Sequence, residues 1–219
     1  MTPDLRLYAL VDPAVAGGRS LPELAKLLVG TATLVQLRDK HGTTRAMIDA
    51  ARALKAVLAP AGIPLLINDR VDVALAAQAD GVHIGQDDMD AADARRLLGP
   101  NAIIGLSIKT PAQAAAAPLD ALDYVAIGGV YATTSKDNTA APIGTQGLRA
   151  IAAAIRARKA GYPVCAIAGI TAANAGEVIA AGADGVAVIS ALSLAAEPVA
   201  AARELRAVVD DALKRRGQG

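Results

Sequence analysis

The segment Gln36-Leu37-Arg38-Asp39-Lys40 places basic and polar side chains directly after an apolar run. If Leu37 points away from the centre of the protein, the two-residue period of a strand turns Gln36 and Arg38 to the same side, with Lys40 just beyond them. Arginine offers a forked grip on phosphate oxygens and lysine offers a mobile point charge, so this segment suits an anionic group. The alternative is an ordinary charged loop with surface ion pairs.

Acidic residues follow two later apolar runs, in the segments Ile67-Asn68-Asp69-Arg70 and Gly85-Gln86-Asp87-Asp88. Magnesium is typically held by one or two carboxylates together with substrate phosphates, so Asp69 and Asp88 are candidate ligands if they follow neighbouring strands. A bound Mg²⁺ would also offset the charge of a diphosphate placed beside them. The alternative is that Asp69 caps one helix and Asp88 merely begins the next.

Small and hydroxyl-bearing residues follow three further apolar runs: Thr133-Thr134-Ser135-Lys136, then Ala168-Gly169, then Ile189-Ser190. Backbone N–H groups and a helix start can bind phosphate there, so we expect a phosphomonoester opposite the first anion. The alternative is that small residues simply allow tight turns. Residues 132–147 form a long polar segment without periodicity, which we interpret as a candidate lid.

These segments need a scaffold that brings successive strand ends to one face. Short runs rich in Val, Ile and Leu alternate with Ala-rich stretches that carry charges at helical spacing, which is typical of repeated βα units. We find eight such runs, at residues 5–11, 34–37, 64–67, 81–84, 103–106, 124–127, 164–168 and 185–189. They predict a single α/β domain over residues 1–219, a (β/α)8 TIM barrel with the tail frayed from about Arg215. An open doubly wound sheet is the alternative, because a strand count does not show that the first strand pairs with the last.

Helix signals agree with this count. Ser20 precedes Pro22 and Glu23, Thr171 precedes Asn174, and the stretch after Pro198 has apolar residues on one face and charges on the other.

Composition narrows the class of partner. The chain has 219 residues, 53% of them apolar and 2% aromatic, with no Phe or Trp and a formal charge of +1. These values argue against a nucleic-acid partner, which would call for basic patches and stacking surfaces. The longest mostly apolar run, residues 185–196, is short for a membrane helix, and the first residues lack the pattern of a signal peptide. We therefore expect a soluble cytoplasmic protein that acts on small molecules, and a homo-oligomer stays open.

Three other residues are weaker candidates. Cys165 is the only cysteine, which excludes an internal disulfide and fits a reducing compartment. Its apolar setting favours packing over nucleophilic chemistry. His83 lies inside an apolar run and favours a structural role, and His41 favours a surface loop. With two histidines and one cysteine, relay hydrolysis and a zinc site are poorly supported.

Taken in order, the segments described above, together with Gly105-Leu106-Ser107 and Gly182-Ala183-Asp184-Gly185, resemble the thiamine-phosphate synthase family over residues 7–191. The resemblance implies a TIM barrel that joins hydroxymethylpyrimidine diphosphate to thiazole phosphate and releases diphosphate with Mg²⁺. Such a reaction depends on positioning and electrostatics rather than on a covalent intermediate.

The resemblance also implies a role for each matching residue. The pyrimidine diphosphate would contact Gln36, Leu37, Arg38, Asp39, Lys40, Asn68, Ser107 and Lys136. The leaving group would be stabilised by Arg38, Lys40 and Lys136, and Mg²⁺ would be held by Asp69 and Asp88. The thiazole phosphate would contact Thr133, Thr134, Ser135, Gly169, Ile189 and Ser190.

The chain departs from the family pattern at a few positions. Lys109 stands where the family often has His, Gly128-Gly129 replaces Gly-Pro, Ser135 replaces Thr, and Ala168 replaces Gly. A thiazole tautomerase on the same barrel is one enzymatic alternative, although it needs an acid or base that is not evident here. A sugar-phosphate isomerase or epimerase is another, and it could use the two carboxylates as its acid and base, but Arg38 and Lys40 would then lack a diphosphate. A phosphate-binding protein without turnover is the non-enzymatic alternative.

Overall fold

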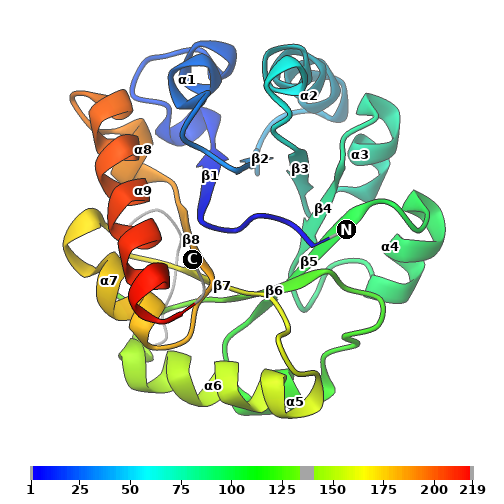
Figure 1. The fold of residues 1–219 in the computed structure, drawn as a ribbon. Helices are drawn as coiled ribbons and strands as arrows, with labels where there is room; N and C mark the ends of the chain where they lie inside the picture. The colour runs from blue at the N-terminus through cyan, green and yellow to red at the C-terminus, as the bar shows by residue number, and fades with distance from the viewer. Residues whose placement is uncertain (1, 134–140, 218–219) are drawn as a thin grey trace.

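A computed structural model of the chain describes residues 2–133 and 141–217, and its eight parallel strands close into a barrel (Figure 1). Closure is explicit, because β1 (Leu7–Val11) pairs with β2 (Leu34–Leu37) on one side and with β8 (Gly185–Val188) on the other. The remaining strands are β3 (Leu65–Asn68), β4 (Gly81–Ile84), β5 (Ile103–Ile108), β6 (Tyr124–Ile127) and β7 (Val164–Ile167). The TIM barrel prediction is confirmed, and the open-sheet alternative is excluded.

Helices surround the strands as an outer ring (Figure 1). They are α1 (Leu21–Leu28), α2 (Thr44–Leu58), α3 (Val71–Ala77), α4 (Ala91–Leu98), α5 (Pro111–Ala116), α6 (Gly144–Arg158), α7 (Ala172–Ala180), α8 (Ser190–Ser193) and α9 (Pro198–Arg215), with short 3-10 turns η1 (Pro13–Val15) and η2 (Ala59–Ala61). The predicted caps are present, since the Ser20 N–H donates to Glu23 at 2.9 Å and the Thr171 N–H donates to Asn174 at 2.8 Å. None of the described helices has the length and apolar character needed to cross a bilayer.

The apolar side chains form two layers, one on each face of the barrel wall. The lumen layer contains Tyr8, Leu10, Leu34, Leu66, Ile103, Tyr124, Ala126, Cys165 and Ala187. A second, larger cluster lies between the strands and the helices. Alternate residues of each strand enter one layer or the other, which is why the strands are apolar on both faces.

The amino end of the barrel is closed by chain that precedes β1. This segment runs across the middle of the barrel in Figure 1, and Leu5 is buried within the lumen layer. A side chain at Gly185 would lie 1.7 Å from the Leu5 carbonyl oxygen, so glycine is required where this segment meets β8.

The same type of side-chain to backbone hydrogen bond recurs at the amino end of the barrel, between neighbouring strands. The N–H groups of Leu65, Ile104 and Val164, at the starts of β3, β5 and β7, donate to Asp80, Asp123 and Asp184, respectively, at 2.8, 2.8 and 2.9 Å. The corresponding N–H of β1 donates to the hydroxyl of Thr33 at 3.1 Å. These residues stand just before the even-numbered strands, so they satisfy backbone donors that the sheet ladder leaves unpaired.

Several predicted boundaries were wrong by a few residues. The seventh strand ends at Ile167 because Ala168 has a φ of +94°, and the eighth ends at Val188 because Ile189 turns into α8. Fraying was predicted from about Arg215. Helix α9 includes Arg215, and Arg216 donates to the carbonyls of Ile179 and Ala183 at 2.8 and 2.7 Å.

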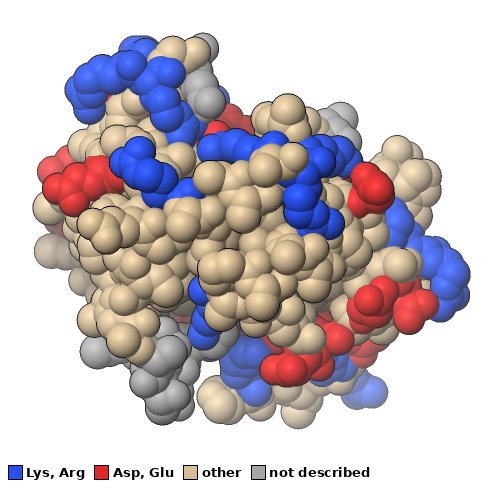
Figure 2. Space-filling model, turned by 90° about the horizontal axis from the view of Figure 1, so that it is seen from below, with Lys and Arg blue, Asp and Glu red and all other residues tan. Residues whose placement is uncertain are grey.

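The surface carries charges of both signs, in keeping with the net charge of +1. On the face drawn in Figure 2, Lys and Arg side chains are interspersed with Asp and Glu side chains around a broad uncharged area.

Candidate active site

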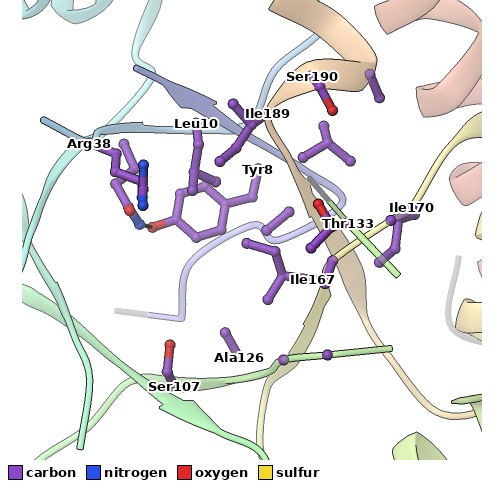
Figure 3. A pocket seen from close by; sticks show the side chains of 18 of the residues that line it. Tyr8, Leu10, Arg38, Ser107, Ala126, Thr133, Ile167, Ile170, Ile189 and Ser190 are labelled. Carbon is purple, nitrogen blue, oxygen red and sulfur yellow. Dashed lines mark hydrogen bonds between the residues drawn. The ribbon is translucent and has the colours of Figure 1, made fainter. Parts of the chain in front are cut away.

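A cavity of about 580 Å³ opens at the carboxyl ends of the strands. Its wall is formed by Tyr8, Leu10, Gln36, Arg38, Asn68, His83, Ser107, Lys109, Ala126, Gly128, Gly129, Ala132, Thr133, Ile167, Ala168, Gly169, Ile170, Thr171, Ala187, Val188, Ile189, Ser190 and Ala191. Figure 3 shows Arg38 on one side of the cavity and Thr133, Ile170 and Ser190 on the other. This is the face on which TIM barrels build their active sites.

Arg38 is held at the cavity wall by Asp12. Leu37 lies in the outer core, as predicted, so Gln36 and Arg38 turn inward to the cavity. The Arg38 guanidinium forms an ion pair with Asp12, whose side chain is only 3% exposed. An arginine fixed in this way can present its remaining N–H groups to an anion.

Two carboxylates and a lysine meet beside the cavity, at the ends of β2, β3 and β4. Lys40 forms an ion pair with Asp69, and the side-chain amide of Asn68 donates to the same carboxylate at 2.6 Å. Asp88 accepts the Gly85 N–H at 2.7 Å. Partial burial raises the pKa of Asp88, and the neighbouring Asp69 carboxylate raises it further, while the Gly85 N–H and Lys40 lower it. Two carboxylates that face each other in this way favour a bound cation.

The capping alternative for Asp69 is not supported. Arg70, rather than Asp69, occupies the cap position of α3. Asp69 has a φ of +62°, a left-handed conformation that is uncommon for a non-glycine residue and clusters at functional sites. Asp69 therefore faces Lys40 and Asp88 instead of the helix that follows it.

A chain of hydrogen bonds crosses the floor of the cavity. The Gln36 amide donates to the Tyr8 hydroxyl, and the hydroxyls of Tyr8 and Tyr124 are 3.0 Å apart. The Tyr124 hydroxyl is 2.8 Å from His83 Nδ1, and His83 Nε2 is 2.9 Å from the Ser107 hydroxyl. His83 is thus a hydrogen-bonded structural histidine, as predicted, although it also reaches the cavity wall.

The opposite side of the cavity is built from turns after β7 and β8. Gly169 has a φ of +66°, and a side chain there would lie 2.4 Å from the Ala132 carbonyl oxygen. Only glycine permits this close approach between the loops after β6 and β7. Thr133, Ile189 and Ser190 line the same region, so their hydroxyl and backbone groups can meet a phosphate.

Some predicted site residues lie elsewhere or outside the described structure. The Leu37 side chain packs in the outer core and cannot contact a ligand in the cavity. The Asp39 carboxylate accepts the N–H groups of His41 and Gly42 at 3.0 and 2.7 Å, so it shapes its own loop. Thr134, Ser135 and Lys136 lie outside the described residues. Helix α6 begins at Gly144, so the last four residues of the predicted 132–147 lid are helical.

Three residues of the site were not anticipated: Tyr8, Asp12 and Tyr124. Asp12 directly follows β1, so the strand-end rule that selected Arg38 and Asp69 could have found it. Tyr8 and Tyr124 are two of only four tyrosines in a chain without Phe or Trp, yet they lie within apolar runs that look like ordinary core. The interpretation of Cys165 as packing agrees with its complete burial, and burial also raises the pKa of its thiol.

A closed barrel with cationic and acidic groups beside its carboxyl-end cavity defines an enzyme of the TIM-barrel class. A family model for thiamine monophosphate synthase matches residues 7–192. A thiamine-phosphate synthase from Agrobacterium fabrum is 51% identical over 97% of each chain, and one from Chloroflexus aurantiacus is 49% identical over 94% of this chain and 93% of its own. The solved structure of a thiamine phosphate pyrophosphorylase from Pyrococcus furiosus superposes with a TM-score of 0.83 at 36% identity, covering 96% of this chain and 98% of that one. The chain belongs to the thiamine-phosphate synthase family, and it is a transferase of thiamine biosynthesis that releases diphosphate.

Proposed function

We propose that the transfer is a dissociative displacement assisted by Mg²⁺, in which hydroxymethylpyrimidine diphosphate is joined to hydroxyethylthiazole phosphate. The observation that carries this proposal is the meeting of two cations, Arg38 and Lys40, with two carboxylates, Asp69 and Asp88, beside one cavity. A diphosphate needs cations, and a metal that bridges it to the protein needs carboxylates.

The leaving group fits the Arg38 side of the cavity. Arg38 and Lys40 would contact its oxygens, and Asn68 lines the cavity at the end of β3. Lys136, which the resemblance assigns to the same group, belongs to the undescribed segment and stays a prediction. Positive side chains that are already in place where negative charge develops on the diphosphate lower the barrier to its departure, because they do not have to reorganise during the reaction.

The two carboxylates fit a magnesium ion. Their oxygens are hard donors, and two of them with phosphate oxygens match the usual coordination of Mg²⁺. Among the described residues no group of three or more His, Cys, Asp or Glu side chains gathers, so the substrate would have to complete the shell. When bound, Mg²⁺ would supply charge stabilisation for the departing diphosphate. Lys40, now paired with Asp69, would be released toward the phosphate oxygens.

The bond changes need no general base. The bond between the methylene carbon and the diphosphate oxygen breaks, and its electron pair leaves with the diphosphate. The thiazole nitrogen then donates its own lone pair to that carbon. Gln36 and Ser107 would orient the pyrimidine. The apolar walls at Leu10, Ile167 and Ile189 would keep water from the carbocation that forms at the pyrimidine methylene when diphosphate leaves.

The second substrate fits the opposite side. Thr133, Gly169, Ile189 and Ser190 line it, and they would receive the thiazole phosphate through hydroxyl and backbone groups. Thr134 and Ser135 stay predictions for this role. The separation of the two sides in Figure 3 leaves the cavity floor between them for the reacting rings.

The test is diphosphate release from purified protein supplied with hydroxymethylpyrimidine diphosphate and Mg²⁺, with and without thiazole phosphate. We expect release that requires the metal, and thiamine phosphate that accumulates in equal amount. Metal-independent turnover would contradict the magnesium assignment. Thiazole phosphate binding without any release would instead favour the tautomerase or the binding protein.

The cellular location and the oligomeric state of the enzyme are predictions from the sequence. A cytoplasmic location stays a prediction based on the single cysteine, together with the expectation of neither nucleic-acid nor membrane partners. The homo-oligomer stays open.

A further inference from the structure

Lys109 is a cationic residue of the cavity wall to which the proposed function gives no role. It directly follows β5 and is partly buried. Among the described residues that line the cavity, Arg38 and Lys109 are the only Lys or Arg, and none is Asp or Glu. The wall therefore carries positive charge at two places, and the two proposed substrates bring two anionic groups.

The backbone of Lys109 is fixed by the start of the helix that follows. Its N–H donates to the Gln113 side-chain oxygen at 2.7 Å, and the Thr110 N–H donates to the same oxygen at 3.2 Å. The Gln113 N–H donates in turn to the Thr110 hydroxyl at 3.2 Å, which completes a capping box at the start of α5. The point at which the Lys109 side chain leaves the barrel wall is thus set by local hydrogen bonds.

The Lys109 side chain leans over the end of β6. A side-chain carbon added at Gly128 would lie 3.6 and 3.7 Å from Cγ and Cε of Lys109, and 3.8 Å from Cγ2 of Ile167. Strand β5 has β4 on one side and β6 on the other, and Gly128 directly follows β6. Because both ends of the lysine stem are close to Gly128, the side chain extends toward β6 and away from β4.

The order of the strands places this cation across the cavity from Arg38. Strands β2 and β6 are four apart in a closed ring of eight, so they face each other across the lumen. Arg38 directly follows β2, whereas Lys109 leans toward the wall built from the turns after β6, β7 and β8. Thr133 and Ser190 belong to that wall and lie opposite Arg38 in Figure 3.

The wall beyond β6 offers a phosphate only neutral donors apart from Lys109, as far as the described residues go. Thr133, Gly169, Ile189 and Ser190 line it, and α8, which begins at Ser190, has four residues and a correspondingly small dipole. A phosphate monoester carries a charge of about −1.5 to −2 at pH 7. Hydroxyl and backbone N–H groups orient such a group, and a cation in a partly buried wall also compensates its charge.

We propose that Lys109 binds the phosphate of the second substrate, and that it sets the preference of the site for the phosphorylated thiazole over the free alcohol. The inference rests on the proposed function, which supplies the identity of that substrate. Arg38 and Lys40 would then contact only the diphosphate, so that each anion has its own cation. The Lys109 amine would form charge-assisted hydrogen bonds, which are stronger than those of the neutral donors around it.

The first test measures binding and does not depend on turnover. Isothermal titration calorimetry compares thiazole phosphate with its dephosphorylated alcohol, on the native chain and on Lys109→Met, which removes the charge and keeps an unbranched apolar stem. We expect affinity for thiazole phosphate to fall about tenfold to hundredfold, the size of a hydrogen bond to a charged group. Affinity for the alcohol should stay native.

The matched control for this test is Lys26→Met, because Lys26 is exposed in the last turn of α1. It should bind both ligands as the native chain does. An unchanged affinity for thiazole phosphate in Lys109→Met, or an equal loss for the phosphate and the alcohol, would overturn the inference. An equal loss would mean that Lys109 shapes the cavity without recognising the phosphate.

The second test shows which anion Lys109 contacts. In steady-state assays, Lys109→Met should raise KM for thiazole phosphate by about tenfold or more and leave KM for the pyrimidine diphosphate within about twofold of native. Arg38→Met should show the reverse pattern. A rise in KM for the pyrimidine diphosphate alone in Lys109→Met would assign the lysine to the leaving group and overturn the inference.

The outcomes separate this inference from the proposed function. If the native chain makes thiamine phosphate and Lys109→Met uses thiazole phosphate equally well, the inference fails and the function stands. If the native chain makes no thiamine phosphate, the proposed function fails. The calorimetric comparison of phosphate with alcohol then still decides whether Lys109 recognises a phosphate monoester.

Discussion

The guanidinium of Arg38 and the carboxylate of Asp12 form an ion pair between the ends of two neighbouring strands. The Arg38 side chain is 15% exposed and that of Asp12 is 3% exposed, so most of the pair is removed from water. Asp12 also accepts the Ala14 N–H at 2.9 Å, which ties it to the turn η1. The arginine proposed to grip the leaving group is thus held by a carboxylate that does not need to touch the substrate.

Asp12→Asn should impair catalysis while preserving the fold. Asparagine can still accept the Ala14 N–H, but it removes the charge that orients Arg38. We expect kcat/KM for the pyrimidine diphosphate to fall about tenfold to hundredfold, measured by steady-state diphosphate release. Asp4→Asn is the control, because Asp4 pairs with Arg6 at a partly exposed site in the segment that precedes β1, at the other end of the barrel. Equal rates in Asp12→Asn and the native chain would show that Arg38 does not depend on Asp12.

Asp69→Asn and Asp88→Asn should each abolish metal-dependent turnover. The amide keeps the shape of the side chain but loses the charge that a hard cation requires. Binding of Mn²⁺ as a magnesium substitute, followed by electron paramagnetic resonance, should weaken in both variants when diphosphate is present. Asp87→Asn alters the adjacent exposed residue and should leave both readouts unchanged. Near-native turnover in both Asp69→Asn and Asp88→Asn would remove the metal site.

Substitutions at residues 168 and 169 should act in opposite directions. Ala168 has a φ of +94°, which glycine adopts without strain, so Ala168→Gly should stabilise the fold by about 1 kcal/mol after the entropy of glycine is subtracted. Gly169→Ala should destabilise it by more than about 2 kcal/mol, because the new side chain meets the Ala132 carbonyl. Denaturant unfolding measures both changes. A loss of stability in Ala168→Gly would show that Ala168 is not strained.

Substitutions at the amino end of the barrel should lower the free energy of unfolding without changing the kinetic constants. Asp184 accepts the Val164 N–H at 2.9 Å and pairs with Arg156 and Arg216 at 2.8 and 2.7 Å. Asp184→Asn should lower the free energy of unfolding by about 1–3 kcal/mol. Its KM values should stay native, because this end lies away from the cavity.

A matched control for Asp184 lies on the surface. Asp120 pairs with Lys159 but is fully exposed, so Asp120→Asn should change neither stability nor activity. A large rise in KM for Asp184→Asn would contradict the separation of the two ends.

Local patterns in the sequence predicted most of the strands and helices and the charged residues at the rim of the site. Apolar runs separated by amphipathic stretches predict the strands and helices, and polar residues at the run ends mark Arg38, Lys40, Asp69 and Asp88. These predictions succeed because side-chain period and strand-end position are local properties. Boundaries were less accurate, as at Ala168, because a positive φ on a non-glycine residue leaves no signal in the sequence.

The amino-acid sequence by itself determined the βα repeat, the basic and acidic strand ends and the likeness to one enzyme family, since each depends on residue types at fixed spacing. Only the tertiary structure decided that β1 closes on β8, that Asp12 holds Arg38, and that Tyr8, Tyr124 and His83 together link Gln36 to Ser107. The physical reason is that these contacts join residues distant in the chain. Their distances follow from barrel closure, which no local pattern encodes.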